Sequence, residues 1–281
     1  MRYLMGVLIC HILGTNNMTR PNKEILTFLI LTFALSAVPY YLIITAGSLG
    51  AGGGWYPIAL MWCPGIAALT TCLTYNKNLR GLGWGWGRSR YQASAYLLPI
   101  GYGLVAYGAV WLSGLGGIDD SFSRNWLNWL LFGTLLNCFA ALGEEIGWRG
   151  FLVGRLAGIT SFTNVALISG AIWALWHMPL ILFADYNAGA PGWYSLLCFA
   201  IMVVASSFAY AWLRLKSGSV WTGMLLHASH NFWIQGFFDP ITTDRGITKY
   251  LIGEFGAALV VVLVVVAYLY WRRRHQLPVT S

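Results

Sequence analysis

The chain has 281 residues, of which 58% are hydrophobic and only 9% are charged, with a mean hydropathy of +0.63. A soluble domain carries about 25% charged residues, so this composition excludes an ordinary soluble protein and indicates a polytopic membrane protein. The net charge of +8 comes mostly from Lys and Arg in the expected loops. Such a charge reports membrane orientation, and no nucleic-acid partner is expected.

The beginning of the chain has two interpretations. Arg2 followed by Leu4–Leu13 resembles the hydrophobic part of a signal peptide, but no small-residue cleavage site follows and the run is too short to span a membrane. We favour translation from Met18, which makes Thr19–Lys23 a cytoplasmic tail. Translation from Met1 is the alternative.

Hydropathy predicts eight helices that each approach the ~20 residues needed to cross ~30 Å of hydrocarbon. The expected spans are residues 25–47, 57–75, 92–113, 125–148, 163–183, 194–214, 219–238 and 250–271. The fold class is therefore all-α, a polytopic helical bundle with both termini cytoplasmic. We expect one transmembrane domain over residues 25–275, between an N-terminal tail over 1–24 and a C-terminal tail over 276–281.

The distribution of basic residues predicts this orientation. The outer loops hold only three of the 17 Lys and Arg residues, Arg124, Arg245 and Lys249, and the other 14 fall on the inner side. The outer loops instead carry aspartates, which are Asp119, Asp120, Asp185, Asp239 and Asp244. This asymmetry supports an even number of spans, and the short loops favour a prokaryotic plasma membrane.

Ionisable and amide side chains fall well inside three of the expected spans, at nearly one depth. They are Glu144, Glu145 and Arg149 in the fourth span, His177 in the fifth, and His227, His230 and Asn231 in the seventh. A charge near mid-bilayer costs roughly 2.5–3.5 kcal/mol, so its default interpretation is a functional site. Glu254, near the outer end of the last span, is expected to reach the membrane interface instead.

Spacing along the helices gives these groups different parts. Glu145 and Arg149 stand four residues apart in the acid-first order, which favours an ion pair on one helix face. Glu144 points about 100° away on a regular helix and is left without that partner. A carboxylate in apolar surroundings suits a general base, and we expect His177 to share a proton or a water molecule with it.

His227 and Asn231 also stand four residues apart and therefore face the same way into the bundle. An imidazole beside an amide donor suits a developing oxyanion. Taken singly, His177 or His230 is explained more simply by a hydrogen bond to a neighbouring helix, and Trp173 by packing. The combination of an acid, imidazoles and an amide at one depth favours a catalytic interpretation.

Three motifs occur in order along the chain. They are Glu144-Glu145-x-x-x-Arg149, Trp173-x-x-x-His177 and His227-x-x-x-Asn231. This pattern resembles the CAAX-protease and bacteriocin-processing family of intramembrane endopeptidases, also called the Abi family and related to the type II CAAX prenyl protease. The matching protease core covers about residues 125–235, and eight spans agree with the architecture of that family. Trp173 stands where the family usually shows Phe, a conservative departure.

The resemblance implies that Glu144 and His177 activate the hydrolytic water. It further implies that His227 and Asn231 stabilise the tetrahedral intermediate. The remaining motif residues would support the site.

Within the first motif, the resemblance implies that Glu145 and Arg149 hold the helix in shape. It also leaves Arg149 open as a contact for a substrate carboxylate. Trp173 belongs with these supporting residues.

The family has been described both as glutamate-dependent and as metal-dependent. Glu144, His177 and His227 have the ligand types of a zinc site with two His and one Glu, and His230 is a spare. No expected span carries a His-Glu-x-x-His helix, and Asn231 is a poor zinc ligand. We therefore favour a site without a cofactor, with zinc bound by the Glu and the two His as the alternative.

We expect an intramembrane endopeptidase that hydrolyses a peptide or protein tail entering from the cytoplasmic side. Prenylated CAAX tails, bacteriocin leaders and membrane-anchored regulators are all compatible substrates, and the lipid bilayer is the other partner. A non-catalytic membrane immunity or adaptor protein on the same scaffold is one alternative. A proton-coupled transporter is another, since Glu and His chains also relay protons, but the sequence lacks the internal repeat that it would show.

Overall fold

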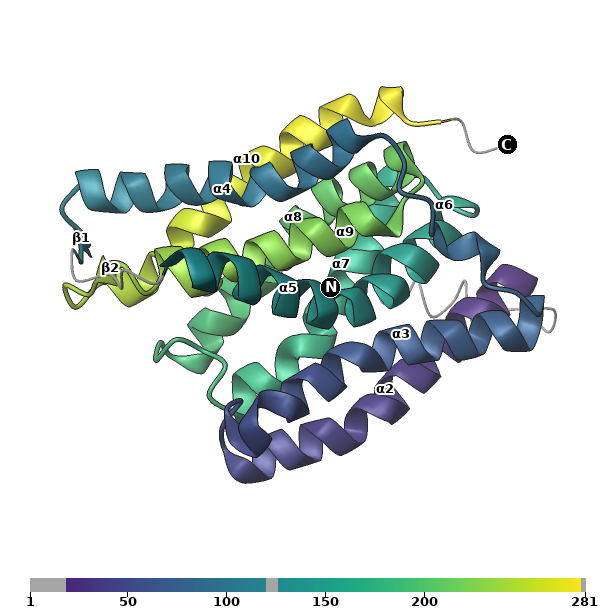
Figure 1. The fold of residues 1–281 in the computed structure, drawn as a ribbon, viewed down its shortest axis with the longest axis horizontal. Helices are drawn as coiled ribbons and strands as arrows, with labels where there is room; N and C mark the ends of the chain where they lie inside the picture. Colours follow the sequence, from purple (N-terminus) through teal and green to yellow (C-terminus); the bar gives the residue numbers. More distant parts are fainter. Residues whose placement is uncertain (1–18, 120–125, 279–281) are drawn as a thin grey trace.

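The computed structural model describes residues 19–119 and 126–278, which form a bundle of long helices (Figure 1). The helices are α2 (Arg20–Ala46), α3 (Trp55–Asn76), α4 (Ser89–Leu112), α5 (Trp126–Glu145), α6 (Gly154–Ala157), α7 (Phe162–Phe183), α8 (Gly192–Ser217), α9 (Val220–His230) and α10 (Ala257–Arg272). Two short antiparallel strands, β1 (Gly117–Ile118) and β2 (Thr242–Thr243), pair two loops at one end of the bundle.

The all-α membrane bundle predicted from hydropathy is confirmed. Among the described residues, five helices are long and apolar enough to cross a membrane: α2, α3 with its preceding turn, α4, α7 and α8. Helix α10 has 16 residues and begins at Ala257, so the last span starts later than expected. The choice between Met1 and Met18 lies outside the described residues.

The helices that carry the polar motifs occupy the middle of the bundle. Helix α5 packs on α3 and α9, helix α9 also packs on α4, and α8 packs on α7 and α10. In Figure 1, α2 and α3 lie side by side along one flank, whereas α4 and α10 run along the opposite flank. Polar side chains on α5, α7 and α9 can therefore be enclosed by other helices.

Two helices change their winding at the polar motifs. Directly after Glu145 the chain continues as a π-helical segment, η3 (Ile146–Val153), and after His230 a second one, η4, covers Asn231–Phe238. In a π turn each N–H bonds five residues back, so side chains rotate relative to an α-helix, and such segments are frequent at functional sites. Hydropathy alone predicts only continuous membrane spans at both places and does not indicate the change of winding.

Small residues bring the end of α5 and the start of η3 unusually close to α3. A Cβ atom added to Gly143 would lie 2.7 Å from the Cα of Trp62, and one added to Gly147 would lie 2.5 Å from the Cβ of Pro64. Side chains at these positions would force the helices apart, which is why small residues recur at close helix crossings in membranes. The two glycines flank Glu144 and Glu145 and hold this stretch against α3.

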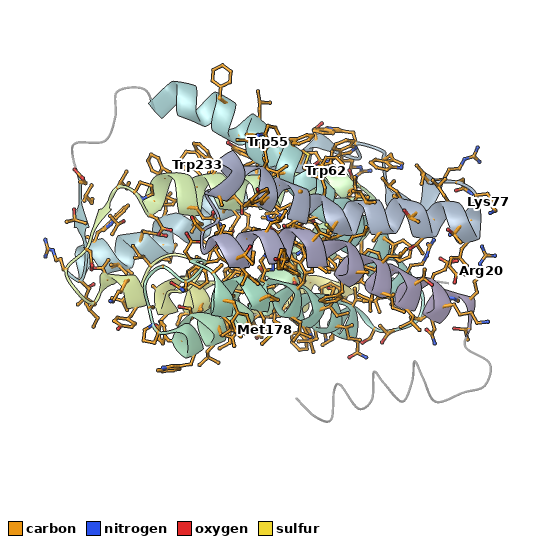
Figure 2. The ribbon with its side chains drawn as sticks, turned by 90° about the horizontal axis from the view of Figure 1, so that it is seen from below. Arg20, Trp55, Trp62, Lys77, Met178 and Trp233 are labelled. Carbon is orange, nitrogen blue, oxygen red and sulfur yellow. The ribbon has the colours of Figure 1, made fainter. Side chains whose placement is uncertain are left out.

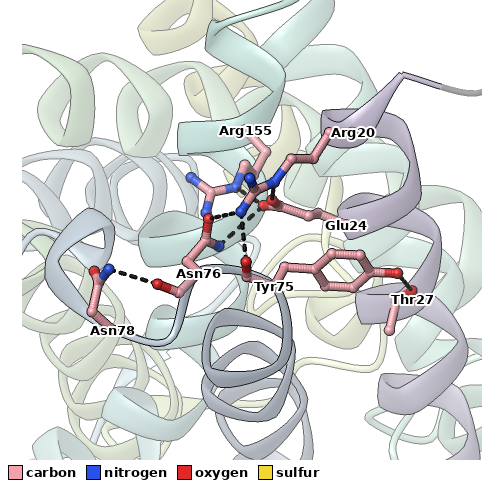
Figure 3. A network of polar contacts seen from close by, with 7 residues as sticks. All are labelled: Arg20, Glu24, Thr27, Tyr75, Asn76, Asn78 and Arg155. Carbon is pink, nitrogen blue, oxygen red and sulfur yellow. Dashed lines mark hydrogen bonds and ion pairs between the residues drawn. The ribbon is translucent and has the colours of Figure 1, made fainter.

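A polar cluster joins three helices at the end of the bundle that carries Arg20 and Arg155 (Figure 3). We call this end the arginine-rich end. Glu24 on α2 accepts hydrogen bonds from Arg155 Nε at 2.6 Å, Arg20 Nε at 3.1 Å and Asn76 Nδ2 at 3.4 Å. Figure 2 places Arg20 and Lys77 at this same end. The basic residues that predict the cytoplasmic face thus include partners of a buried carboxylate that ties α2, α3 and α6 together.

Candidate active site

A cavity of about 170 Å³ lies among α3, α5, α7, α8 and α9. The four side chains predicted to be catalytic all line it, namely Glu144, His177, His227 and Asn231. Three helices separated by long stretches of sequence therefore bring these groups to one place. Their convergence agrees with the common depth that the sequence predicts.

Glu144 is nearly fully buried, with 1% of its surface exposed. Its Oε2 accepts a hydrogen bond from Trp173 Nε1 at 2.7 Å and another from Trp148 Nε1 at 3.2 Å. Among the described residues, its Oε1 has no hydrogen-bond partner, and the side chain borders the cavity. One oxygen is thus held by two indoles while the other remains able to accept a proton from a molecule in the cavity.

Glu145 forms the centre of a buried charged group. Its Oε1 lies 2.8 Å from Arg149 Nη1 and 2.9 Å from His227 Nδ1. The ion pair with Arg149 that the spacing predicts is present, and the contact to His227 is an addition that the sequence did not reveal. A Cβ atom on Gly223 would lie 2.5 Å from Glu145 Oε2, so a glycine on α9 is needed for this close approach.

Arg149 is enclosed by aromatic rings. Its guanidinium carbon lies 3.9 Å from the ring centre of Trp173 and 3.8 Å from that of Tyr210, and 3% of its surface is exposed. Cation–π contacts of this kind are strongest where water is excluded. Arg149 is therefore committed to Glu145 and to two rings, and this burial does not favour the contact with a substrate carboxylate that the sequence left open.

Both cavity histidines are anchored through the same ring nitrogen. His177 Nδ1 lies 2.9 Å from the carbonyl oxygen of Trp173, and His227 Nδ1 faces the Glu145 carboxylate. Because these oxygens only accept hydrogen bonds, Nδ1 carries the hydrogen in each ring. Nε2 is therefore the nitrogen that remains for chemistry, as an acceptor in a neutral ring and as a donor in a protonated one.

Asn231 begins the π-helical segment one residue after α9 and lines the cavity. Its amide makes no side-chain hydrogen bond to any residue that the structure describes. An amide donor that is free and faces a cavity can point its N–H groups at a bound molecule. Asn231 is therefore placed as the expected oxyanion partner of His227.

The structure corrects the expectation for Glu254 and adds a polar cluster that the sequence did not reveal. Glu254 does not reach the interface: it is 7% exposed and its Oε1 lies 3.0 Å from His230 Nε2. Tyr186 donates a hydrogen bond to Glu254 Oε2, and Tyr102 bonds to His230 Nδ1. Both ring nitrogens of His230 thus have partners, and Glu254 is buried because its two oxygens are bonded to His230 and Tyr186.

Trp148 and Trp173 make hydrogen bonds at the site that the sequence does not predict. The sequence predicts packing or motif support for Trp173 and predicts no role for Trp148, whereas both indoles donate to Glu144. The position of Trp148, four residues after Glu144, is the signal that could have revealed it, since that spacing places two side chains on one helix face. Phe has no hydrogen-bond donor, so Trp in place of Phe at position 173 adds a hydrogen bond to Glu144.

The arrangement does not favour the zinc alternative. Within residues 19–119 and 126–278, no three His, Cys, Asp or Glu side chains come close enough to hold a metal ion. Glu144, His177 and His227 share the cavity wall, but they do not converge in the tight geometry that zinc requires.

Comparison with known proteins shows that the segment with the three motifs is similar to CAAX prenyl endopeptidases. Residues 126–233 match the family model described as Type II CAAX prenyl endopeptidase Rce1-like, and this segment contains every residue of the three motifs. The protein named CAAX prenyl protease 2 from Methanococcus maripaludis is 32% identical over 103 residues, which cover 34% of this chain and 35% of that protein. The chain thus aligns with about a third of that relative's length, and the resemblance to CAAX proteases is confirmed for the segment that carries the three motifs.

Proposed function

We propose that this chain, which matches the Rce1-like CAAX prenyl endopeptidases over residues 126–233, is an intramembrane endopeptidase. The observation that carries the proposal is the cavity itself. A carboxylate with one free oxygen, two histidines with free Nε2 atoms and an unpaired amide meet on its wall. This is the set of groups that hydrolysis of an amide needs.

Glu144 and His177 are the groups proposed to activate water. A water molecule is held by Glu144 Oε1 and His177 Nε2. It gives a proton to the Glu144 carboxylate while the oxygen of the water bonds to the scissile carbonyl carbon. That proton then passes to the leaving nitrogen as the C–N bond breaks. The products are a carboxylic acid and an amine, so the water is fully accounted for.

His227 and Asn231 are the groups proposed to stabilise the oxyanion. Because His227 Nδ1 is bonded to Glu145, its Nε2 can donate to an oxyanion only when the ring is doubly protonated. The Glu145 carboxylate stabilises that charged ring, in the way a carboxylate supports the histidine of a serine protease. Glu145 is therefore a positioning residue for His227 in addition to its pairing with Arg149.

The cavity also bears on the class of substrate. Apolar side chains form much of its wall, including Leu60, Met61, Leu180, Phe199 and Met202. A peptide segment that lies at or in the membrane, with or without an attached lipid, suits such a wall. We propose a membrane-anchored or lipid-modified peptide or protein as substrate, in a prokaryotic plasma membrane.

The test is cleavage of membrane-tethered fluorescent peptides by the purified chain, with and without a chelator. The panel includes prenylated CAAX tails, the same tails without the lipid, and leader-type peptides. We expect cleavage that resists the chelator and that Glu144→Gln or His177→Ala abolishes. His275→Ala is the control, since His275 is exposed and lies outside the cavity.

Full cleavage by Glu144→Gln would defeat the mechanism. Cleavage that the chelator removes and zinc restores would replace it with a metal-dependent one. A biological effect that survives in cleavage-dead variants would favour the adaptor alternative.

A further inference from the structure

The walls of the catalytic cavity identify the face from which it is reached. Leu49 and Pro57 lie where α2 passes into α3, Tyr186 lies between α7 and α8, and Gln235 and Glu254 lie between α9 and α10. All five belong to connections or helix ends on the side of the bundle away from the N-terminus of α2 and the C-terminus of α3. Arg20 and Lys77 mark that opposite, arginine-rich end in Figure 2. Among the described residues that line the cavity, none comes from a loop at the arginine-rich end.

A second cavity of about 360 Å³ adjoins the first on this side. The two share Tyr186, Gln235 and Glu254 as wall residues. We call this second cavity the vestibule. Its outer wall comes from the loops around residues 185–188 and 239–253. The vestibule therefore leads from the loops of one membrane face to the Tyr186–Glu254 hydrogen bond at the rim of the catalytic cavity.

Three aspartates that line the vestibule each accept a hydrogen bond from a group behind its wall. Asp185 accepts from the backbone N–H of Leu49 at 2.8 Å, and Asp244 accepts from that of Gly246 at 2.8 Å. Asp239 accepts from the hydroxyl of Tyr107. These bonds fix the aspartates in the loops that shape the vestibule, and we interpret the vestibule as a passage because it shares three wall residues with the catalytic cavity.

The opposite side of Glu144 is closed by packing. All eight residues of η3 are buried. The Phe28 ring lies 5.7 Å from that of Trp148 and 4.9 Å from that of Phe151, and Arg214 Nε donates to the carbonyl oxygen of Arg149 at 3.0 Å. Aromatic rings and buried guanidinium groups thus fill the space between Glu144 and the arginine-rich end.

We propose that the catalytic cavity is entered from the face opposite the arginine-rich end, which the positive-inside rule makes the extracytoplasmic face. This inference rests on the proposed function in one respect, because it takes the molecule that enters the cavity to be the substrate of an endopeptidase. It takes the substrate to be a peptide segment that leaves the membrane on the outer side, and it brings the hydrolytic water through the vestibule. The direction is the reverse of the cytoplasmic entry expected from the sequence.

The test uses single cysteines in the full-length chain after its five native cysteines have been replaced. Gln235→Cys places a thiol on the wall that the two cavities share, at an exposed position outside the proposed chemistry. Arg88→Cys, also exposed, is the matched control in the loop before α4 at the arginine-rich end. A charged, membrane-impermeant maleimide is added to right-side-out membrane vesicles and then to vesicles opened with detergent.

We expect Gln235→Cys to react in sealed vesicles and Arg88→Cys to react only in opened ones. The adduct at Gln235→Cys should also slow peptide cleavage at least about tenfold, while that at Arg88→Cys leaves it within about twofold, because only the former obstructs the passage. Reaction of Arg88→Cys alone in sealed vesicles overturns the proposal. So does a folded chain in which Gln235→Cys reacts from neither side.

The labelling does not depend on proteolysis. If no peptide is cleaved but Gln235→Cys reacts from outside, the outward orientation of the vestibule stands and the proposed function fails. If cleavage holds but labelling follows the reverse pattern, the entrance fails and the function stands.

Discussion

Two buried carboxylates, Glu24 and Glu144, show what distinguishes a structural acid from a candidate catalytic one. Glu24 is 3% exposed and Glu144 is 1% exposed, so burial does not separate them. Both oxygens of Glu24 are occupied by Arg20, Arg155 and Asn76 (Figure 3). Glu144 has one oxygen held by two indoles and the other free at a cavity.

The difference lies in the remaining capacity to accept a hydrogen bond. A carboxylate saturated by cations is stabilised where it is and has little left to offer a substrate. Hydrogen bonds from neutral indoles orient Glu144 without giving it a counter-ion. We therefore expect the amide substitution to affect mainly activity at Glu144 and mainly stability at Glu24.

Paired substitutions of these two acids should give the largest contrast. Glu144→Gln removes the proposed base, and we expect kcat to fall about 10²- to 10⁴-fold with little change in thermal stability. Glu24→Gln should leave kcat within about threefold but lower the free energy of unfolding by roughly 1–3 kcal/mol, a range that allows for partial exposure of the two arginines. Peptide cleavage and thermal inactivation in detergent measure both effects. The comparison breaks if the two variants lose activity equally.

Glu145→Gln separates the positioning of His227 from the base itself. The variant leaves Arg149 without its carboxylate and His227 without the group that stabilises its doubly protonated ring. We expect kcat to fall about 10- to 100-fold while KM stays nearly constant, because the interaction acts in the transition state. Steady-state kinetics measure this split. A rise in KM alone would show that the group serves binding instead.

Trp173→Phe removes a hydrogen-bond donor while keeping an aromatic ring. Since Trp173 Nε1 donates to Glu144, we expect about a tenfold loss of kcat from the less well oriented carboxylate. Trp176→Phe is the matched control, because Trp176 Nε1 donates to Ser36 on α2 and not to Glu144. Equal losses in both variants would indicate packing and not orientation.

Asp239 extends the comparison to the vestibule and to pH. Burial, opposed by the hydrogen bond from Tyr107 and reinforced by the charge of Glu254, raises the pKa of Asp239 from 3.8 to about 6. The folded chain thus binds this proton more tightly than the unfolded chain, so its contribution is fully present below about pH 4 and is lost as the pH rises through about 6.

Asp239→Asn should flatten this dependence, because its side chain stays neutral. Between pH 4 and pH 7 we expect the parent chain to lose stability relative to the variant. The loss in its free energy of unfolding is on the order of 2 kcal/mol, and its apparent melting temperature falls accordingly. Thermal unfolding in detergent at both pH values measures the difference. Parallel curves for the two proteins would contradict the raised pKa.

Hydropathy and motif spacing by themselves determine much of what this protein is. The apolar composition excludes a soluble fold, and most expected spans agree with the observed helices within a few residues. Spacing paired Glu145 with Arg149 and identified the four residues that share the cavity. Such inferences succeed because length, helical period and the cost of a charge in lipid are local properties of the chain.

Only the tertiary structure decided which partners those residues meet and from which side. The bonds from Trp148 and Trp173 to Glu144 and from His227 to Glu145 depend on how helices cross. The burial of Glu254 depends on a loop that folds back onto α9. The side of the vestibule likewise depends on loops whose sequences are only polar, since a cavity is a property of several segments packed together and no single segment encodes it.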